Sequence, residues 1–541
     1  MKKFLTVLSV IFLINSPNVS AETLDDAGRQ LDRLRQDMEK QRIKEQIDED
    51  RNREENSVEV EENKTPKGEE SNLKFLLTKI TVDESEIITE KILNEIAAPY
   101  INIEIGVNEL YEIVQKINDY YQKEGYLTCR AFLKNQTITG GVVHISLIEG
   151  KTGEVTLSGN KNTAKKYFTR RVKINSGEVQ NISELNRQLN EFNLTNDVKL
   201  AISLKAGKAP GTTDYELKAI EPKNHVFTLY ADNDGPKSTG EGRVGLYYNN
   251  RSLFKHRDSL LLGYMHSKGT DSFNVSYSIP AGLRGEKLRF SYGTSGTENV
   301  ANRSLNLRGH AYYADLTFSK PLKLTMKERS EIGLSLGINH SVNDIADAIS
   351  IVDNETKTAA LYFSRTNYLP RSVFYRRYSY TVGRWKDEVA ANRQNYGVFY
   401  FNTFYQHAWE HGQIFDVDLN AQWSSTKDLP SSAQFSIGGR GTVRGYKNNL
   451  IEGTDGAILN IEYGIPFGKN FKAFCFADAG FVNNTFLQLK DKKLAGAGVG
   501  LQAYVDDKIS ASLAIAFPLK REINDEEQSK SRLHVSFTGR F

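Results

Sequence analysis

From residue 223 to the C-terminus, hydrophobic and polar residues alternate in short segments that are separated by turn-rich stretches. The last segment, RLHVSFTGRF, is the clearest, and its hydrophobic positions are Leu533, Val535, Phe537 and Phe541. Its remaining positions are mostly charged or polar, so a strand here has one apolar and one polar face. A soluble sandwich also alternates, but rarely with charged residues along one face of so many strands. We therefore predict a membrane-spanning antiparallel β-barrel over residues 223–541.

The number of these segments decides whether the barrel can close. We count about seventeen candidate strands, whereas closed bacterial barrels of this kind have an even number. The uncertain stretch is Lys357–Trp385, where TAALYFSRTNYL and SVFYRRYSYTVGRW form either one long strand or two. Sixteen and eighteen strands both fit the length of the region, and we expect about 16.

The N-terminal region has three successive patterns. Residues 1–21 combine a basic start, a short apolar run and small residues at a cleavage position, which predicts a secretory signal peptide. Residues 22–47 are predicted to form an amphipathic helix whose hydrophobic positions recur at steps of three and four: Leu24, Ala27, Leu31, Leu34 and Met38. Residues 48–72 are acidic and have almost no large apolar side chains, which predicts a flexible linker.

Two segments between the linker and the barrel share one order of elements. In residues 73–150 the patterns predict a strand, two helices and two further strands, and residues 151–222 repeat this β-α-α-β-β order. In the first segment Val143, Ile145 and Leu147 alternate toward a core. We therefore predict two small α+β domains in tandem.

Composition excludes several classes of protein. A net charge of +3 over 541 residues does not suggest a nucleic-acid partner. No stretch after the N-terminal segment reaches about 18 uninterrupted apolar residues, so we expect no transmembrane helix. Cys129 and Cys475 fall in different predicted domains, so the fold is not expected to depend on a disulfide.

One stretch has the spacing of a zinc motif: HAWEH, from His407 to His411. Zinc chemistry needs both histidines on one face of a helix, but this stretch ends a predicted strand, where positions i and i+4 lie about 13 Å apart. No Ser, His and Asp combination and no set of metal-ligating residues lies on predicted elements that would bring the side chains together. We therefore expect no metal, no cofactor and no enzymatic activity.

The glycine-rich stretch SIGGRGTVRGY, Ser436 to Tyr446, is not a phosphate-binding loop. It lacks the Lys and Ser/Thr that end such a loop, and no helix follows it. QFSIGG before it and AILNIEYGIP after it are predicted strands, so the stretch begins a strand-to-strand loop, residues 438–455. Four glycines permit sharp turns with positive φ, namely Gly438, Gly439, Gly441 and Gly445. Such turns suit a loop that folds back on itself with Arg444 near its tip.

If this loop enters the barrel lumen, the Arg444 guanidinium leaves bulk water and needs an anion. A candidate lies in FKAFCFADAGF, where the apolar face includes Phe471 and Phe481 and the opposite face carries Lys472 and Asp478. Alternation therefore points Asp478 inward. Asp478 is therefore a candidate partner of Arg444.

Three stretches of the sequence resemble motifs of one known protein family. GYLTCRAFLKNQTITGGVVHISLIEG is similar to the end of a first POTRA domain, and the loop and strand motifs are V-R-G-Y and F-x-D-x-G. The motif positions are Val443, Arg444, Gly445 and Tyr446 in the loop, and Phe476, Asp478 and Gly480 in the strand. With these motifs the chain resembles the TpsB outer-membrane transporters of two-partner secretion, the haemolysin-activator and filamentous-haemagglutinin-transporter type. The resemblance covers essentially the whole mature chain. It implies two POTRA domains in the periplasm, a 16-stranded barrel, a plug helix, and an Arg444–Asp478 contact through the lumen.

The resemblance also implies a function. A large partner exoprotein, of the haemolysin, adhesin or contact-dependent toxin type, would be exported across the outer membrane without ATP. The POTRA domains would capture its N-terminal secretion domain, for which strand addition is one mode, and the helix would leave the lumen when the partner arrives. The chain is expected to act as a monomer in outer-membrane lipid. The barrel assembly machinery would insert it, guided by the terminal Phe541.

Other functions are weighed against this one. An insertase that folds other barrels shares the loop and the POTRA domains, but insertases typically carry more such domains, and the N-terminal helix argues against that role. A passive porin has no reason to carry a long periplasmic region. We therefore expect Arg444→Ala to impair secretion while the protein still reaches the outer membrane.

Overall fold

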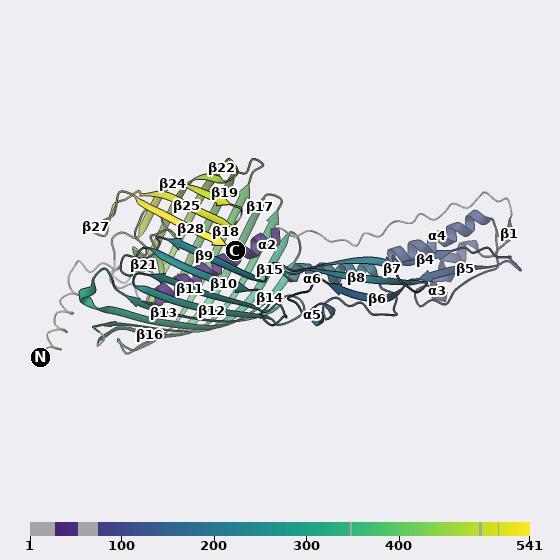
Figure 1. Cartoon of the computed structure of the whole chain (residues 1–541), viewed down its shortest axis with the longest axis horizontal. Helices are drawn as coiled ribbons and strands as arrows, with labels where there is room; N and C mark the ends of the chain where they lie inside the picture. Colours follow the sequence, from purple (N-terminus) through teal and green to yellow (C-terminus); the bar gives the residue numbers. More distant parts are fainter. Residues whose placement is uncertain (1–26, 52–73, 347–348, 486–488, 507) are drawn as a thin grey trace. The chain divides into compact units, whose positions relative to one another are not determined.

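The computed structural model of the chain describes residues 27–51, 74–346, 349–485, 489–506 and 508–541. The predicted signal peptide, Leu24 and most of the predicted linker lie outside the described residues. The chain divides into two compact units, one formed by Met1–Arg53 with Lys223–Phe541 and the other by Glu54–Pro222. Figure 1 labels the elements of both. Among the described residues, no helix is both long enough and apolar enough to cross a membrane.

The first unit is built around a closed barrel, in which each strand pairs antiparallel with its neighbours and β28 returns to β9. Within the described residues this barrel has sixteen strands, in agreement with the prediction. In barrel order they are β9 (His225–Asp232), β10 (Arg243–Asn250), β11 (Ser259–Ser267), β12 (Thr270–Pro280), β13 (Lys287–Glu298), β14 (Leu307–Leu324), β15 (Glu328–Ile345), β16 (Ile349–Leu369), β17 (Ser372–Asp387), β18 (Asn392–Ala408), β19 (Ile414–Ser424), β22 (Asp455–Phe467), β23 (Phe471–Asn483), β24 (Lys493–Val505), β25 (Ile509–Pro518) and β28 (Arg532–Arg540).

Two points of the strand assignment are resolved by the structure. The uncertain stretch forms two strands, β16 and β17. The predicted strand QFSIGG does not join the barrel, because β20 (Phe435–Ile437) pairs with β21 (Ile451–Gly453) within a loop. Phe435 and Ile437 are both buried, so neither faces lipid. Removing this strand from the seventeen candidates gives the even number that closure requires.

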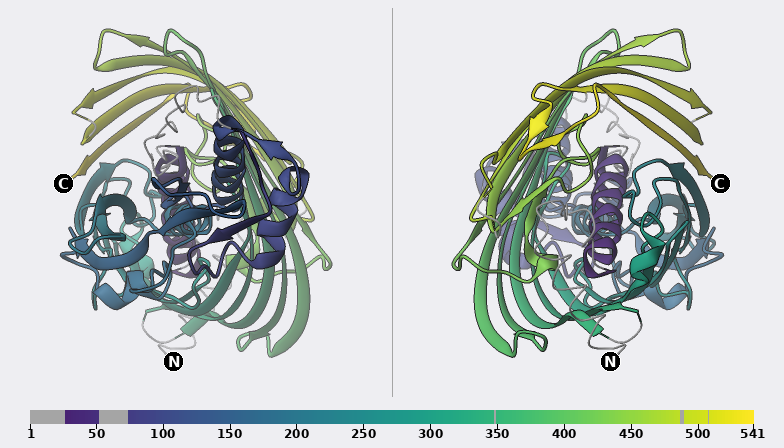
Figure 2. Two further views of the ribbon diagram at one scale, coloured as in Figure 1. Left: turned by 90° about the vertical axis from the view of Figure 1, so that its right-hand side faces the viewer. Right: turned by 90° about the vertical axis from the view of Figure 1, so that its left-hand side faces the viewer.

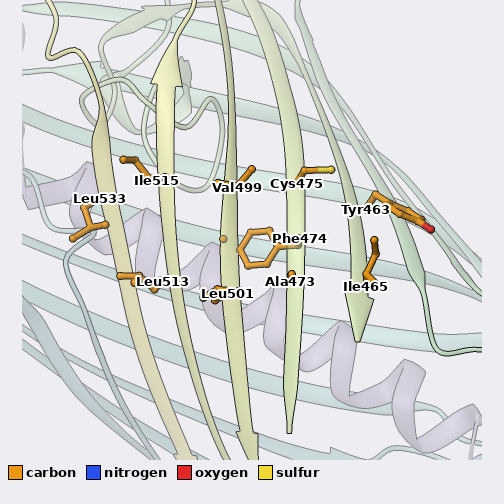
Figure 3. Close-up of a pocket in the computed structure, with 11 residues that line it drawn as sticks. Tyr463, Ile465, Ala473, Phe474, Cys475, Val499, Leu501, Leu513, Ile515 and Leu533 are labelled. Carbon is orange, nitrogen blue, oxygen red and sulfur yellow. The ribbon is translucent and has the colours of Figure 1, made fainter. Parts of the chain in front are cut away.

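The barrel wall has the predicted alternation. On β28, Leu533 and Val535 are 53% and 41% exposed, whereas His534 between them is 7% exposed. Figure 3 shows a hollow on the outer face across β22–β25 and β28. Its volume is about 600 Å³, and its lining is apolar: Tyr463, Ile465, Ala473, Phe474, Cys475, Val499, Gly500, Leu501, Leu513, Ile515 and Leu533. Apolar side chains on the outside and polar ones inside match a wall between lipid and a wet lumen.

Helix α2 (Ala27–Arg51) lies inside the barrel, as both views of Figure 2 show. It is longer than predicted, because Asp48–Arg51, assigned to the linker from sequence, continue the helix. The extension is held by Asp50, which is 5% exposed and accepts a hydrogen bond from the Tyr368 hydroxyl at 2.6 Å. Ile43 and Ile47 contact a cluster on the wall that contains Tyr368, Val373 and Tyr375. The predicted apolar face, which ended at Met38, therefore continues for two more turns.

The second unit contains two domains with one topology. The first domain consists of β1 (Phe75–Leu76), β2 (Lys79–Val82), α3 (Glu90–Ala97), η2 (Ala98–Tyr100), β3 (Glu104–Ile105), α4 (Val107–Lys123), β4 (Cys129–Phe132) and β5 (Val142–Glu149). The second domain consists of β6 (Lys151–Ser158), α5 (Lys165–Thr169), α6 (Ile182–Thr195), β7 (Lys199–Ala206) and β8 (Thr212–Ile220). The sheet orders are β2-β5-β4 and β6-β8-β7, and in each the first strand is parallel to the central one.

Both domains close around a helix face that the sequence indicated. Leu110, Ile113, Val114 and Ile117 of α4 are buried in the first core. Leu185, Leu189 and Phe192 of α6 are buried in the second. The Asn181 side chain accepts a hydrogen bond from the Glu184 backbone N–H at 2.9 Å, which caps α6. Cys129 is a free thiol within the first core, and burial raises its pKa to about 12.

Candidate functional site: the lumen loop and its arginine

The connection between β19 and β22 is a loop of residues 425–454, which begins earlier than the predicted 438–455. Its stem is the β20–β21 pair, with Ile437 opposite Ile451. The loop carries its own apolar cluster, which includes Val443 and Tyr446 and packs on residues of the barrel wall: Ile458, Val482 and Leu494. A loop with a packed core is a defined structural element rather than a loose connection.

Glycines shape the turn that carries the arginine. Gly438, Gly439 and Gly445 have φ of 111°, 96° and 98°, a region that favours glycine. Gly441 corrects the prediction, because its φ is not in this region and a Cβ there would meet no atom within 4 Å. The Gly438 N–H donates to the Thr442 hydroxyl oxygen at 2.8 Å, which fixes the start of the turn.

The structure brings Arg444 and Asp478 together through three hydrogen bonds. The Arg444 Nε donates to Asp478 Oδ2 at 2.7 Å and its Nη2 donates to Oδ1 at 2.8 Å, which is a bidentate pair. The Arg444 backbone N–H also donates to Oδ2 at 3.0 Å. Asp478 is 3% exposed. The pair is therefore a buried, directional contact between the loop and β23.

Three further residues complete the site: Asn460 and Glu462, which were not predicted from the sequence, and Phe476, which is a position of the predicted strand motif. The Arg444 Nη1 donates to Glu462 Oε2 at 3.0 Å, and the Asn460 amide donates to Asp478 Oδ1 at 2.8 Å. The Arg444 guanidinium lies 3.4 Å from the centre of the Phe476 ring. Alternation along AILNIEYGIP places Asn460 and Glu462 on one face, so the signal was present. Only the register, in which Asn460 faces Asp478, shows that they reach the arginine.

The other motif positions bring the loop backbone against the wall. A Cβ at Gly480 would lie 3.1 Å from the Val443 side chain, so the glycine leaves room for the loop. A Cβ at Gly445 would lie 2.9 Å from the Pro518 nitrogen of β25. The Tyr446 hydroxyl donates to the Ala495 carbonyl of β24 at 2.9 Å. The V-R-G-Y and F-x-D-x-G motifs are thus two halves of one interface.

Basic and acidic side chains of helix α2 form ion pairs with the lumen loop and the barrel wall. Arg29 pairs with Glu452 of the loop at 2.8 Å, and Arg35 pairs with Asp315 at 2.9 Å. Glu39 has a different set of partners: Arg42 of the helix at 2.6 Å, Arg377 at 3.0 Å and Arg289 at 3.7 Å.

The described part of the predicted apolar face also contacts the wall. Ala27 and Leu31 pack with Ala311 and Tyr313, and Leu34 packs with Tyr247 and Met265, with Met38 beside them. Leu24 lies outside the described residues. The helix thus combines small apolar contacts with ion pairs that reach both the loop and the wall.

The zinc-like stretch is placed at a strand end. His407 is the residue before the last of β18 and its Nδ1 lies 2.7 Å from the Ser372 hydroxyl, while Glu410 pairs with Arg371. Over the described ranges, the structure has no group of three or more His, Cys, Asp or Glu side chains that could hold a metal ion.

A sixteen-stranded barrel with an arginine-tipped loop in its lumen, preceded by POTRA domains, is the architecture of the two-partner secretion transporters of the outer membrane. The chain belongs to the haemolysin secretion/activation protein family ShlB/FhaC/HecB, whose pattern matches residues 211–503. Residues 75–150 match a ShlB-type POTRA domain. The barrel therefore lies in the outer membrane and the POTRA domains lie in the periplasm.

Curated relatives and solved structures agree with this family. The chain is 24% identical over 502 residues to the heme/hemopexin transporter protein HuxB of Haemophilus influenzae, covering 84% of this chain and 86% of the relative. It is 22% identical over 478 residues to the outer membrane transporter CdiB of Escherichia coli, covering 82% and 79%. The solved CdiB structures from Escherichia coli and Acinetobacter baumannii superpose with TM-scores of 0.62 and 0.63, at 20% and 18% identity. Each superposition covers 94% of this chain and 98% of the other, which shows a common fold.

Proposed function

We propose that this chain exports a large partner exoprotein from the periplasm to the cell surface by two-partner secretion, without ATP. The observation that supports this function best is the Arg444 loop docked on β23, in a lumen that a charged helix occupies. A passive pore needs neither a docked loop nor an occupied lumen. Free energy for transport would come from binding of the partner and from its folding outside the cell.

We propose that α2 is a plug that leaves during transport. Its contacts are largely ion pairs and hydrogen bonds, such as Arg35 with Asp315 and Glu39 with Arg377. A hydrogen bond to a charged group contributes only about 1.5–3 kcal/mol net, because water replaces it when the contact breaks. A helix held in this way can exchange its polar contacts for water as it leaves, while the apolar contacts that Leu31, Leu34 and Ile47 make with the wall must break as well.

The partner is proposed to bind at the sheet edges of the POTRA domains, 73–150 and 151–222. Among the described strands, β2 and β4 in the first domain and β6 and β7 in the second each pair on one side only. A strand of the partner's secretion domain can therefore extend either sheet. A cavity of about 520 Å³ lies beside the start of the first domain, and its lining includes Phe75, Leu76 and Ile138. This cavity offers apolar contacts to a strand added there.

The finer expectations on assembly are also proposals. We propose that the transporter acts as a monomer and that the barrel assembly machinery recognises its C-terminal strand with Phe541. The Phe541 backbone pairs with Phe227, the N–H donating at 2.8 Å and the carbonyl accepting at 3.0 Å. The terminal residue would therefore take part in closing the barrel during insertion.

The proposed function is tested by deleting the gene in its own host and quantifying cell-surface and released proteins by mass spectrometry. We expect one large exoprotein to be lost and to return when the wild-type gene is supplied. The Arg444→Ala variant should reach the outer membrane at the wild-type level and fail to restore the exoprotein. Normal export by this variant would contradict the assigned role of the loop.

The same experiment separates secretion from insertion of other barrels. An insertase would alter the abundance of many outer-membrane barrels, whereas a two-partner transporter changes only its exoprotein. A general fall in outer-membrane barrels, with the exoprotein unaffected, would overturn the proposed function.

A further inference from the structure

The barrel closes through its shortest strand pairing. The register between β28 and β9 runs over five positions, from Ser536 opposite Asp232 to Arg540 opposite Thr228. The other side of β9 pairs with β10 over eight positions. Beyond the five positions, the Asn233 side chain continues the seam by donating to the Leu533 carbonyl at 2.8 Å and accepting from the Val535 N–H at 2.9 Å. The backbone pair of Phe227 with Phe541 extends the seam at one end, and the Asn233 side chain supplements it at the other.

A second arginine of the lumen loop contacts both strands of this seam. The Arg440 Nη2 donates to the Ser536 hydroxyl oxygen on β28 at 2.7 Å. Its Nη1 donates to Asp234 Oδ2, just after β9, at 3.2 Å. The Asn448 amide of the same loop donates to the Asp234 carbonyl at 2.7 Å. Two loop side chains therefore hold the position at which β9 ends.

The Asp234 carboxylate is well placed to receive this contact. Arg243 of β10 lies 3.9 Å from Asp234 Oδ2, but its main partner is Asp232, whose Oδ1 accepts from Arg243 Nε at 2.7 Å. The His534 ring lies 3.6 Å from Asp234 Oδ1. Arg440 thus supplies the shortest charged contact of the Asp234 side chain in the described part of the chain.

The two arginines lie four positions apart on one tight turn. Arg444 is bound to Asp478 on β23, and Gly445 and Tyr446 lie against β25 and β24. Arg440 then reaches β28 and the end of β9. The turn therefore touches five consecutive strands of the barrel, β23, β24, β25, β28 and β9. A Cβ at Gly439 would lie 1.8 Å from the Asn448 side chain, so the backbone of the turn packs directly against Asn448.

We propose that Arg440 is a positioning residue that holds the lumen loop against both strands of the closing seam. Docking of Arg444 on Asp478 and pairing of β28 with β9 are then coupled. Separation of β9 from β28 would pull the turn off β23, and release of the turn would weaken the seam. Coupling of this kind is reciprocal, because both contacts depend on one rigid element. The part that this coupling plays in export rests on the proposed function, whereas the coupling itself is a property of the barrel alone.

The test is hydrogen–deuterium exchange of the purified full chain in detergent micelles, which needs no partner. Arg440→Ala should raise the exchange of the β28 and β9 backbone amides about tenfold, since a hydrogen bond to a charged group is lost at each strand. Amides of β14 and β15, far from the turn in barrel order, should keep the wild-type rate. Lys447→Ala is the matched control, because Lys447 lies in the same loop and pairs with Glu526 outside the seam.

Two further variants distinguish loss of the Arg440 contacts from a general loss of stability. Arg440→Lys should restore most of the protection, because it keeps a donor and the charge. Arg440→Ala combined with Asp234→Asn should raise exchange by less than the product of the two single effects, because the Arg440–Asp234 contact is lost in both. Wild-type exchange at the seam in Arg440→Ala, or an equal effect of Lys447→Ala, would overturn the proposal. The exchange experiment does not depend on the secretion assay. A negative result for the Arg440 coupling and a negative result for the proposed function can therefore be told apart.

Discussion

Loss of the Asp478 carboxylate should undock the lumen loop. In Asp478→Ala, Arg444 loses three hydrogen bonds and keeps only Glu462 and the Phe476 ring. Removing one partner of a buried ion pair destabilises by about 3–5 kcal/mol. Because Glu462 remains as an acceptor, we take the lower end, about 3 kcal/mol, which corresponds to roughly a hundredfold larger undocked population.

The undocked population can be measured by thiol labelling. Val443 is fully buried against Gly480, so a Val443→Cys reporter reacts with maleimide only when the loop leaves β23. The reporter is made with Cys475→Ser. Its labelling rate should rise about a hundredfold when Asp478→Ala is added, because the rate follows the open population. Gly441→Cys is the control, since a side chain there meets no atom and Gly441 is already exposed.

A double-mutant cycle separates the pair from its surroundings. Arg444→Ala should also speed labelling of the Val443→Cys reporter, and the combination with Asp478→Ala should be far less than additive, because both remove one interaction. The reasoning would be refuted if Asp478→Ala raised the labelling rate less than threefold, or if the two free-energy changes added. Either result would mean that packing of the apolar loop core, rather than the ion pair, holds the loop.

The remaining predictions concern the plug and the thiols. Deletion of Ala27–Arg51 should raise single-channel conductance in planar bilayers. Arg377→Glu should raise it partway, because it places a carboxylate opposite Glu39 where one of its guanidinium partners lies. Unchanged conductance in the deletion would argue against a plug. Cys129 should resist alkylation in the folded protein at pH 8, since burial raises its pKa to about 12 and leaves almost no thiolate. Cys475 on the outer face should react with a lipid-soluble maleimide, which mass spectrometry can check.

Several features of the molecule were accessible from local pattern. Two-residue alternation made the barrel strands recognisable and pointed Asp478 inward, because successive side chains of a strand face opposite sides. Three- and four-residue spacing identified the face of α2 through Ala27, Leu31 and Leu34. Each of these patterns depends on the geometry of a single helix or strand, so it can be recognised from the residues of that element alone.

Other features required partners that are distant in the chain. The extension of α2 depends on Asp50 meeting the Tyr368 hydroxyl, and QFSIGG became a loop strand because its side chains pack inside the loop rather than against lipid. Local propensity gives no sign of either, since both depend on what lies opposite.

The sequence by itself determined the class of fold, the order of the domains, and the loop arginine with its acidic partner. The tertiary structure decided which groups surround that pair and how the loop crosses the barrel. Glu462 reaches Arg444 because β22 and β23 pair in one register, and Arg440 reaches Asp234 and Ser536 because closure brings the first and last strands together. Register and closure are properties of the whole sheet. A shift of one residue would reverse which side chains face the lumen, and no single strand carries that information.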